Sequence, residues 1–173
     1  MHLNPYGEYA VLLAVDLIWN PPENGAALQH RCEEAGLTVD RPGTDADLQA
    51  VNDFLQSWLE VVDAPTDQAR ADALNELLDA TSAHPRLTDH AGDGWHLHYR
   101  KMGLTVSQQV NSLISVGTAL HLVGRGMHRL GRCALPDCHR PFADVTRNGR
   151  QRYCTHPCAN RDAVRRHRAK SAA

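Results

Sequence analysis

Four cysteines near the C-terminal end of the chain form two short-spaced pairs. The pairs are Cys133-x4-Cys138 and Cys154-x3-Cys158, and fifteen residues separate them. Two such pairs joined by a loop of this length can close a tetrahedron of thiolates around one Zn²⁺. Because four thiolates leave no open coordination position, the pattern predicts one structural zinc ion rather than a catalytic one.

The two histidines next to the cysteine pairs and the fifth cysteine are not expected to bind the metal. His139 and His156 lie beside these cysteines and could replace one, but every cysteine is already correctly spaced, so we interpret both as neighbours. Paired spacing favours a metal in a reducing compartment over disulfides. The fifth cysteine, Cys32, falls in a helical pattern, and we expect it to pack as a small apolar residue.

The cysteine segment has few large apolar residues of its own. Phe142 and Tyr153 are the two that we identify within about 40 residues, too few for a core that folds alone. We therefore expect metal binding to stabilise the segment, by about 10–16 kcal/mol as in small zinc peptides.

Charge divides the chain into two parts. Residues 1–123 hold 6 Lys/Arg and 17 Asp/Glu, a net charge of −11, whereas residues 124–173 hold 12 Lys/Arg and 3 Asp, a net charge of +9. Such a basic appendage is typical of a protein that binds nucleic acid. Two alternatives stay open: the basic segment folds back onto the acidic part, or it docks on an acidic protein partner.

A helix is expected after Cys158, with Arg161, Arg165 and Arg168 on one face and suited to a DNA major groove. Arginines between the cysteine pairs could bind phosphates beside it. The residues predicted to contact double-stranded DNA are Arg147, Asn148, Arg150, Arg152, Asn160, Arg161, Arg165, Arg166 and Arg168. For the two asparagines, a structural role at the ends of the cysteine turns is the favoured interpretation.

This segment resembles the CGNR-type zinc finger family. The matching residues are Cys133-Ala134-x3-Cys138, Phe142-x-Asp144-x-Thr146-Arg147-Asn148, Arg152-Tyr153-Cys154 and Cys158-Ala159-Asn160-Arg161. The family usually has Ser, Trp and Gly where Thr146, Tyr153 and Ala159 stand here, and alanine at a helix start favours helix. Upstream, Val15-Asp16-Leu17-Ile18-Trp19-Asn20, Ala35-Gly36-Leu37 and Leu74-Asn75-x-Leu77-Leu78 look similar to the ABATE domain that the family pairs with this finger. The resemblance implies a bacterial, stress-induced transcription regulator that binds DNA.

The remaining pattern predicts a mainly α-helical protein with one β-hairpin, divided into a helical domain (1–130) and the zinc finger (131–173). Periodicity, caps and breakers predict helices over 7–19, 23–34, 45–62, 66–80 and 105–130, and a hairpin over 87–90 and 95–100. The last helix is expected to face the core with Val106, Val110, Leu113, Leu120, Val123, Met127 and Leu130. Since it leads almost directly to Cys133, it predicts a stiff connection between the two domains.

The helical domain shows no residue set typical of an active site, so we expect no enzyme. Its histidines, His90, His96, His98, His121 and His128, are interpreted as exposed hairpin residues or helix positions rather than a second metal site. The domain is a candidate for binding a small-molecule effector between helices or for forming a homodimer. No stretch is long and apolar enough to cross a membrane, and we expect a cytoplasmic, nucleoid-associated protein.

Overall fold

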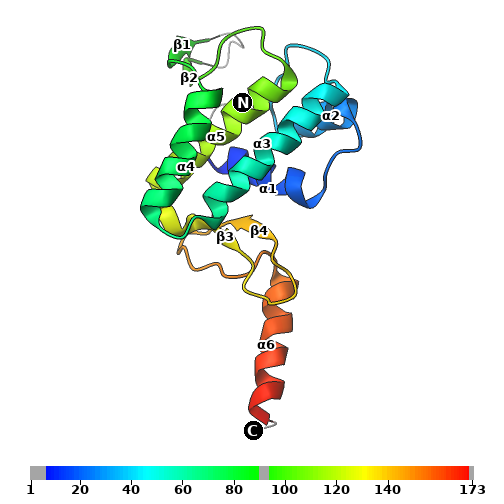
Figure 1. Cartoon of the computed structure of the whole chain (residues 1–173), viewed down its shortest axis with the longest axis vertical. Helices are drawn as coiled ribbons and strands as arrows, with labels where there is room; N and C mark the ends of the chain where they lie inside the picture. The colour runs from blue at the N-terminus through cyan, green and yellow to red at the C-terminus, as the bar shows by residue number, and fades with distance from the viewer. Residues whose placement is uncertain (1–6, 90–93, 172–173) are drawn as a thin grey trace.

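The computed structural model describes residues 7–89 and 94–171, and the structural statements below concern these residues. They form a helical body and a small C-terminal module from which the last helix projects (Figure 1). The body consists of α1 (Glu8–Trp19), α2 (Gly25–Glu34), α3 (Asp45–Asp63), α4 (Asp67–Thr81), β1 (Arg86–Thr88), β2 (His96–His98) and α5 (Val106–Arg125). A short turn at the end of the body, η1 (Met127–Arg129), leads into the module, which consists of β3 (Leu130–Arg132), β4 (Pro141–Ala143) and α6 (His156–Ser171). The predicted fold class, mainly α with a C-terminal cysteine cluster, is confirmed.

Threonine caps begin three of the body helices. The Thr44 and Thr105 side chains accept hydrogen bonds from the backbone N–H three residues later, and Asp47 and Gln108 return the bond in full capping boxes. Thr66 caps α4 in the simpler way, by accepting from Ala69 N. Each cap satisfies backbone N–H groups that the first helical turn leaves without a partner, which is why the predicted starts of α3, α4 and α5 are confirmed to within a residue or two.

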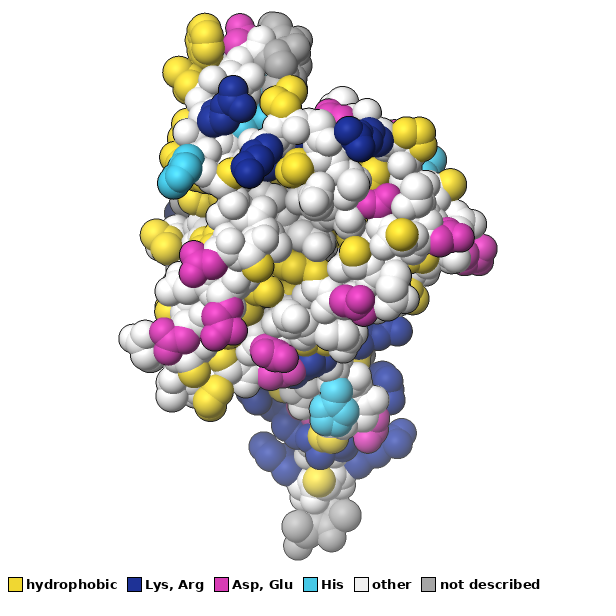
Figure 2. Space-filling view, turned by 45° about the horizontal axis from the view of Figure 1, so that its top comes forward, with side chains coloured by type: hydrophobic (Ala, Val, Ile, Leu, Met, Phe, Trp, Pro, Cys, Tyr) yellow, Lys and Arg dark blue, Asp and Glu magenta, His cyan; other side chains and the backbone are white. Residues whose placement is uncertain are grey.

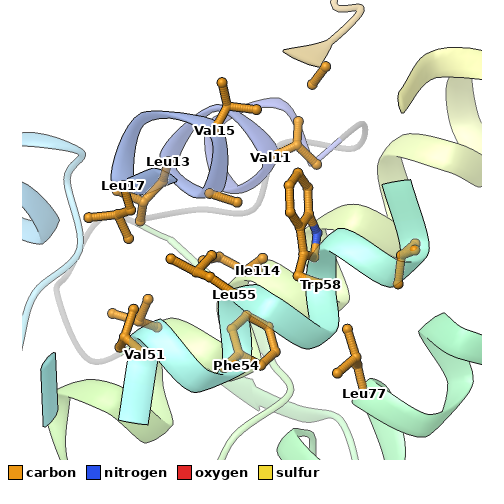
Figure 3. Packing of buried hydrophobic residues seen from close by; sticks show 14 of the residues in the cluster. Val11, Leu13, Val15, Leu17, Val51, Phe54, Leu55, Trp58, Leu77 and Ile114 are labelled. Atoms are coloured by element: carbon orange, nitrogen blue, oxygen red, sulfur yellow. The ribbon is translucent and has the colours of Figure 1, made fainter. Parts of the chain in front are cut away.

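The core lies where α1 packs against α3 and α5. Figure 3 shows Val11 and Leu17 of α1 facing Leu55 and Trp58 of α3, with Ile114 of α5 beside them. All five are almost completely buried. Burying a side chain of this size stabilises a fold by about 1.5–3 kcal/mol, so this group dominates the packing of the body.

Two close contacts fix the helices of the core. Trp58 Nε1 donates a hydrogen bond of 2.9 Å to Thr118 Oγ1, which satisfies a buried indole N–H. Gly117 lets α1 approach α5, since a Cβ at this position would lie 2.2 Å from the Cβ of Ala10. Cys32 is also fully buried, and burial raises the pKa of its thiol to about 12, in keeping with the packing role expected for it.

The predicted helix over 105–130 is too long. It ends at Arg125, because Gly126 adopts a φ of 114° that a helix cannot contain. A 3₁₀ turn and strand β3 follow, so the stiff helical connection to Cys133 is wrong. Val123 was expected to face the core, but 86% of its surface is exposed to solvent.

Strands occur in two places rather than the one expected. In the first sheet β1 pairs with β2 antiparallel, with Arg86 opposite His98, Leu87 opposite Leu97 and Thr88 opposite His96. The second sheet pairs β3 with β4 and was not predicted. The predicted strand residue His90 lies outside the described residues. Among the described helices, none combines the length and apolar character needed to cross a bilayer.

Candidate zinc centre and nucleic-acid interface

The fold brings the four predicted cysteines together. The Sγ atoms of Cys133, Cys138, Cys154 and Cys158 all lie within 4.8 Å of one another. Three of the Sγ–Sγ distances are 3.6, 3.7 and 3.8 Å, for Cys138–Cys154, Cys154–Cys158 and Cys158–Cys138. Zn–S bonds of about 2.3 Å in a tetrahedron place the sulfurs about 3.8 Å apart. The cluster therefore has the size of a four-thiolate zinc site.

Backbone hydrogen bonds shape the first cysteine turn. Cys133 N donates to Arg140 O and Cys138 N donates to Leu135 O, at 2.9 and 3.0 Å. Leu135 is 2% exposed and packs with the cysteines, an apolar contribution that the sequence interpretation missed. The turn closes at His139, whose φ of 53° is the left-handed conformation. His139 and His156 lie outside the cluster, as expected.

The electrostatics of the cluster favour a cation. Burial, followed by hydrogen bonds from neighbouring thiols, raises the pKa of the Cys154 thiol well above its ordinary value, whereas a hydrogen bond with the Thr155 side chain lowers the pKa of Cys158 to about 7. Four thiolates this close repel one another in a partly buried site, so they require a dication to be stable together. With all four donors turned inward, such an ion would be structural.

A buried ion pair, Arg129 with Asp144, joins the end of the body to the loop between the cysteine pairs. Arg129 Nη1 lies 3.5 Å from Asp144 Oδ1 and donates to the carbonyl oxygens of Asp144 and Thr146. The Asp144 carboxylate accepts from Thr146 N and Gln151 N, each at 2.9 Å. Burial alone would raise the pKa of Asp144, but these hydrogen bonds outweigh it and lower that pKa. The two oxygens of the Asp144 carboxylate thus bind two separate points of the loop, at Thr146 and at Gln151.

A second carboxylate, Asp162, anchors α6. It accepts from Tyr153 Oη at 2.6 Å and from Arg165 Nε and Nη2 at 3.0 and 2.7 Å, and Arg166 Nε lies 2.9 Å away. The Tyr153 hydrogen bond and then that of Arg165 lower the pKa of Asp162. Asp162 is 4% exposed, although the rest of α6 beyond it faces solvent.

The module is attached to the body through α1 and α3. Trp19 Nε1 donates a hydrogen bond of 2.9 Å to Pro141 O, and the Arg140 guanidinium lies 5.2 Å from the centroid of the Trp19 ring. Arg132 forms a two-pronged ion pair with Asp63, at 2.6 and 2.8 Å. These contacts hold the sheet of the module against the body while α6 points away from it (Figure 1). The basic helix is therefore not folded back onto the acidic part.

Basic side chains gather on the narrow module, and acidic ones on the body (Figure 2). All nine residues predicted to contact DNA are exposed: Arg147, Asn148, Arg150, Arg152, Asn160, Arg161, Arg165, Arg166 and Arg168. One groove, of about 410 Å³, lies between the inter-pair loop and the start of α6 and is lined by Asn148, Arg150 and Arg152. A second, of about 540 Å³, is lined by Asn160, Arg161, Arg165 and Arg168. Of the two asparagines, Asn148 also accepts a hydrogen bond from Thr146 Oγ1 at 3.1 Å.

Those histidines of the body that the structure describes do not gather into one cluster. His121 is fully buried in α5 and His128 is exposed in η1. His96 and His98 are half-buried on β2 rather than fully exposed, and their Nε2 atoms lie 3.1 Å apart. Within the described residues, the four cysteines form the one group of three or more side chains able to hold a metal ion together.

The residues that sequence reasoning missed are the carboxylates and Arg129 that hold the module together. Asp144 and Asp162 are two of only three acidic residues in 124–173. An isolated acid among twelve basic residues is a usable signal, because it is the natural partner for whichever arginines fold against it. Arg129 carried no such signal, since its carbonyl partners become close only in the folded loop.

Comparison with known families agrees with this geometry. The model for the CGNR zinc finger matches residues 129–171. The ABATE model, described as "Putative stress-induced transcription regulator", matches residues 20–134. No curated protein matches the chain. The two descriptions are those of a zinc finger and a regulator, not of an enzyme. The chain belongs to the ABATE family and ends in a CGNR zinc finger built for one structural zinc ion.

Proposed function

We propose that the protein is a DNA-binding transcription regulator whose zinc finger presents α6 and the inter-pair loop to double-stranded DNA. The observation that carries this proposal is the exposed basic surface of the module, which projects away from an acidic body. Phosphate neutralisation supplies most of the affinity of such surfaces. An acidic body would be repelled by the same duplex, so the charge division orients the molecule on DNA.

The geometry of α6 supports a major-groove contact. The helix has 16 residues, and Arg161, Arg165 and Arg168 share one groove of the surface. Arg165 uses Nε and Nη2 to bind Asp162, which fixes its direction while its side chain stays 57% exposed. A guanidinium held in this way loses less side-chain entropy when it binds a phosphate or a guanine.

The inter-pair loop is suited to the DNA backbone. Arg150 and Arg152 line the groove beside the first turn of α6, where the backbone N–H groups of a helix start also favour anions. Phosphates placed there would lie next to the bases read by α6. We assign the same role to Arg147 and Asn148 at the tip of the loop, and base or phosphate contacts to Asn160 and Arg166.

The test is a duplex-binding titration with the full, zinc-loaded chain. The variant Arg165→Ala/Arg166→Ala should bind a mixed-sequence duplex more weakly and keep its zinc. The negative slope of log K against log salt should become shallower by about 2, because two phosphate contacts are lost. For the unchanged chain, six phosphate contacts would reduce affinity by about 10³ between 50 and 200 mM salt. Arg41→Ala removes an exposed arginine from the acidic body and serves as the control.

Failure to bind any duplex at low salt, with zinc retained, would overturn the proposal. It would favour the rival function, a zinc finger that docks its basic surface on an acidic protein partner. Equal affinity in the double variant and the unchanged chain would remove α6 from the interface.

We assign the zinc to Cys133, Cys138, Cys154 and Cys158, and we place the boundary between the domains at residues 130 and 131. The sulfur separations support the first assignment. The change of charge and the two family matches, which overlap over 129–134, support the second.

A small-molecule effector is the proposed partner of the body. A cavity of about 50 Å³ lies beneath β2 and is lined by Leu97, Leu113 and Val116. Gln109 also lines it and is fully buried; its Nε2 donates to Leu104 O, while its Oε1 has no hydrogen-bond partner. A ligand group that donates one hydrogen bond to this oxygen would satisfy a buried acceptor. Since ligand pockets usually measure about 300–1,000 Å³, an effector would place only such a group in this cavity.

A homodimer is proposed on the outer face of α1, where Tyr9 and Leu12 are 58% and 42% exposed. A dimer would present two fingers and double the DNA surface that one finger covers. As a bacterial regulator the protein would act in the cytoplasm, at the nucleoid. Light scattering of the full chain with and without a duplex tests the oligomeric state.

A further inference from the structure

The strand β2 carries two histidines whose ring nitrogens face one another. His96 and His98 are two positions apart, so their side chains leave the same face of the strand, and Leu97 between them is directed to the other. Their Nε2 atoms lie 3.1 Å apart, and the ring centroids are 4.9 Å apart with the planes tilted by 56°. The hairpin lies at the opposite end of the molecule from α6 (Figure 1).

The backbone sets the tautomer of His96. Its Nδ1 lies 2.8 Å from Gly94 O, and because a carbonyl can only accept, Nδ1 carries the hydrogen and donates it. In the neutral ring Nε2 then holds a lone pair and accepts a hydrogen bond of 3.1 Å from His98 Nε2–H. A metal ion placed between the two nitrogens would replace this proton, with His98 changing to the tautomer that carries its hydrogen on Nδ1. Histidines that bind metals are usually oriented in this way, with the second ring nitrogen donating to a carbonyl or carboxylate.

The separation of the two nitrogens fits a particular metal geometry. With metal–nitrogen bonds of about 2.0–2.1 Å, nitrogens 3.1 Å apart subtend an angle of roughly 95–102° at the ion. A tetrahedral ion would need them about 3.4 Å apart. Neighbouring positions of a square-planar or octahedral ion would lie about 2.9 Å apart. The observed separation is nearer to that value than to the tetrahedral one, and Ni²⁺ and Cu²⁺ with imidazole ligands prefer that geometry.

We propose that His96 and His98 form a second metal site, specific for a divalent ion of the Ni²⁺ and Cu²⁺ class and separate from the four-cysteine centre. The two residues are half-buried, so water can complete the coordination sphere. The acidic part of the chain, with a net charge of −11 over residues 1–123, attracts a dication. One cation opposes it: Arg86 stands opposite His98 in the register of the hairpin.

The experiment is a calorimetric titration of the full, zinc-loaded chain with Ni²⁺, with zinc release followed in parallel. Ni²⁺ is the probe because, unlike Cu²⁺, it does not oxidise thiols. The unchanged chain should take up one Ni²⁺ that survives in His30→Ala, a variant that lacks an exposed histidine on α2. His96→Ala and His98→Ala should each weaken binding by about tenfold or more, since the second ligand of a chelate acts at a high effective concentration. Arg86→Gln should increase the affinity for Ni²⁺, because it removes the positive charge opposite His98.

His96→Gln and His98→Gln repeat the test without removing a polar side chain, so that a change in hairpin structure cannot be mistaken for loss of a ligand. The proposal is overturned by an unchanged Ni²⁺ affinity in His96→Ala/His98→Ala, by an absence of Ni²⁺ uptake, or by uptake that releases one equivalent of zinc, which would place the ion at the cysteines. DNA binding is measured separately and does not affect the result.

Discussion

The phenolic oxygen of Tyr153 donates a 2.6 Å hydrogen bond to Asp162, across the zinc finger from the loop to the helix. Tyr153 directly precedes Cys154, and Asp162 follows Cys158 by one helical turn. The same carboxylate binds Arg165. One buried acid therefore connects the two halves of the metal centre with the arginine face that we propose for DNA.

Replacing Tyr153 by Phe should weaken DNA binding and leave zinc content unchanged. The variant keeps the ring but removes the hydrogen bond, so Asp162 holds the first turns of α6 less firmly and Arg165 loses its fixed direction. We expect affinity for a duplex to fall by about 2- to 10-fold, the range of a single hydrogen bond. Amide hydrogen exchange in α6 should also become faster.

Tyr99→Phe is the matched control, because Tyr99 belongs to the body and directly follows β2, away from both the finger and the face proposed for the dimer. Equal affinity and exchange rates in Tyr153→Phe and in Tyr99→Phe would show that the Tyr153–Asp162 bond does not position α6.

The cysteine cluster and the helix starts could be predicted because their signals are local. Cysteine spacing alone identifies the four sulfurs that the fold places within 4.8 Å, and Thr44, Thr66 and Thr105 each bind a backbone N–H only three residues away. The family resemblance, read from residues around the cysteines, is confirmed for the same reason.

Other parts of the molecule depend on contacts between distant residues. Strands β3 and β4 have three residues each and enclose the first cysteine turn, so neither shows an alternating pattern of useful length. The end of α5 depends on the positive φ of Gly126, a conformation that glycine permits but does not require. The roles of Asp144 and Arg129 arise only once the loop has folded around them.

Removal of zinc should unfold the finger and leave the body folded. A chelator, or the variant Cys154→Ser, takes away the cation that the closely spaced thiolates require, and the small apolar group around Leu135 cannot replace its contribution of about 10–16 kcal/mol. Helix α6 supplies 16 of the 92 residues in α-helices. Circular dichroism should therefore lose about a sixth of the helical signal, with a body that still melts cooperatively.

Cys32→Ser is the informative comparison for this experiment, since Cys32 is buried in the body and far from the sulfur cluster in sequence. It should lower the stability of the body and keep the zinc. Loss of all helical signal on chelation would contradict the independent stability of the two parts.

Replacing Gly149 by Ala should destabilise the finger by about 1–3 kcal/mol. Gly149 has a φ of 64°, and a Cβ there would lie 2.7 Å from Cζ of Arg129. The guanidinium cannot move away, because it is buried and donates to three carbonyl oxygens. Chemical denaturation of the zinc-loaded chain measures the loss, and Gly124→Ala, at an exposed position inside α5, should have the opposite sign because alanine favours helix. A neutral effect at Gly149 would show that the loop has room to rearrange.

The stability of the body should depend on pH through Asp47. This carboxylate accepts from Ser107 N and Oγ at 3.0 and 2.8 Å and from the Thr44 hydroxyl at 2.7 Å, which ties the start of α3 to that of α5. Burial would raise the pKa of Asp47, but these hydrogen bonds outweigh it and lower that pKa far below its ordinary value. A carboxyl whose folded pKa is lowered stabilises the protein above the unfolded pKa of about 3.9 and loses that contribution as the pH falls toward the folded value.

Asp47→Asn should therefore cost about 1–3 kcal/mol of stability at pH 7, and the difference from the unchanged chain should shrink as the pH falls below about 5. Denaturation of both proteins in the metal-free form measures this difference without interference from acid release of zinc. Asp53→Asn, at an exposed position on the same helix, should follow the unchanged chain at every pH. If Asp47→Asn runs parallel to the unchanged chain down to the lowest pH, then the Asp47 carboxylate does not contribute through its charge, and the join between α3 and α5 must be maintained by the apolar contacts alone.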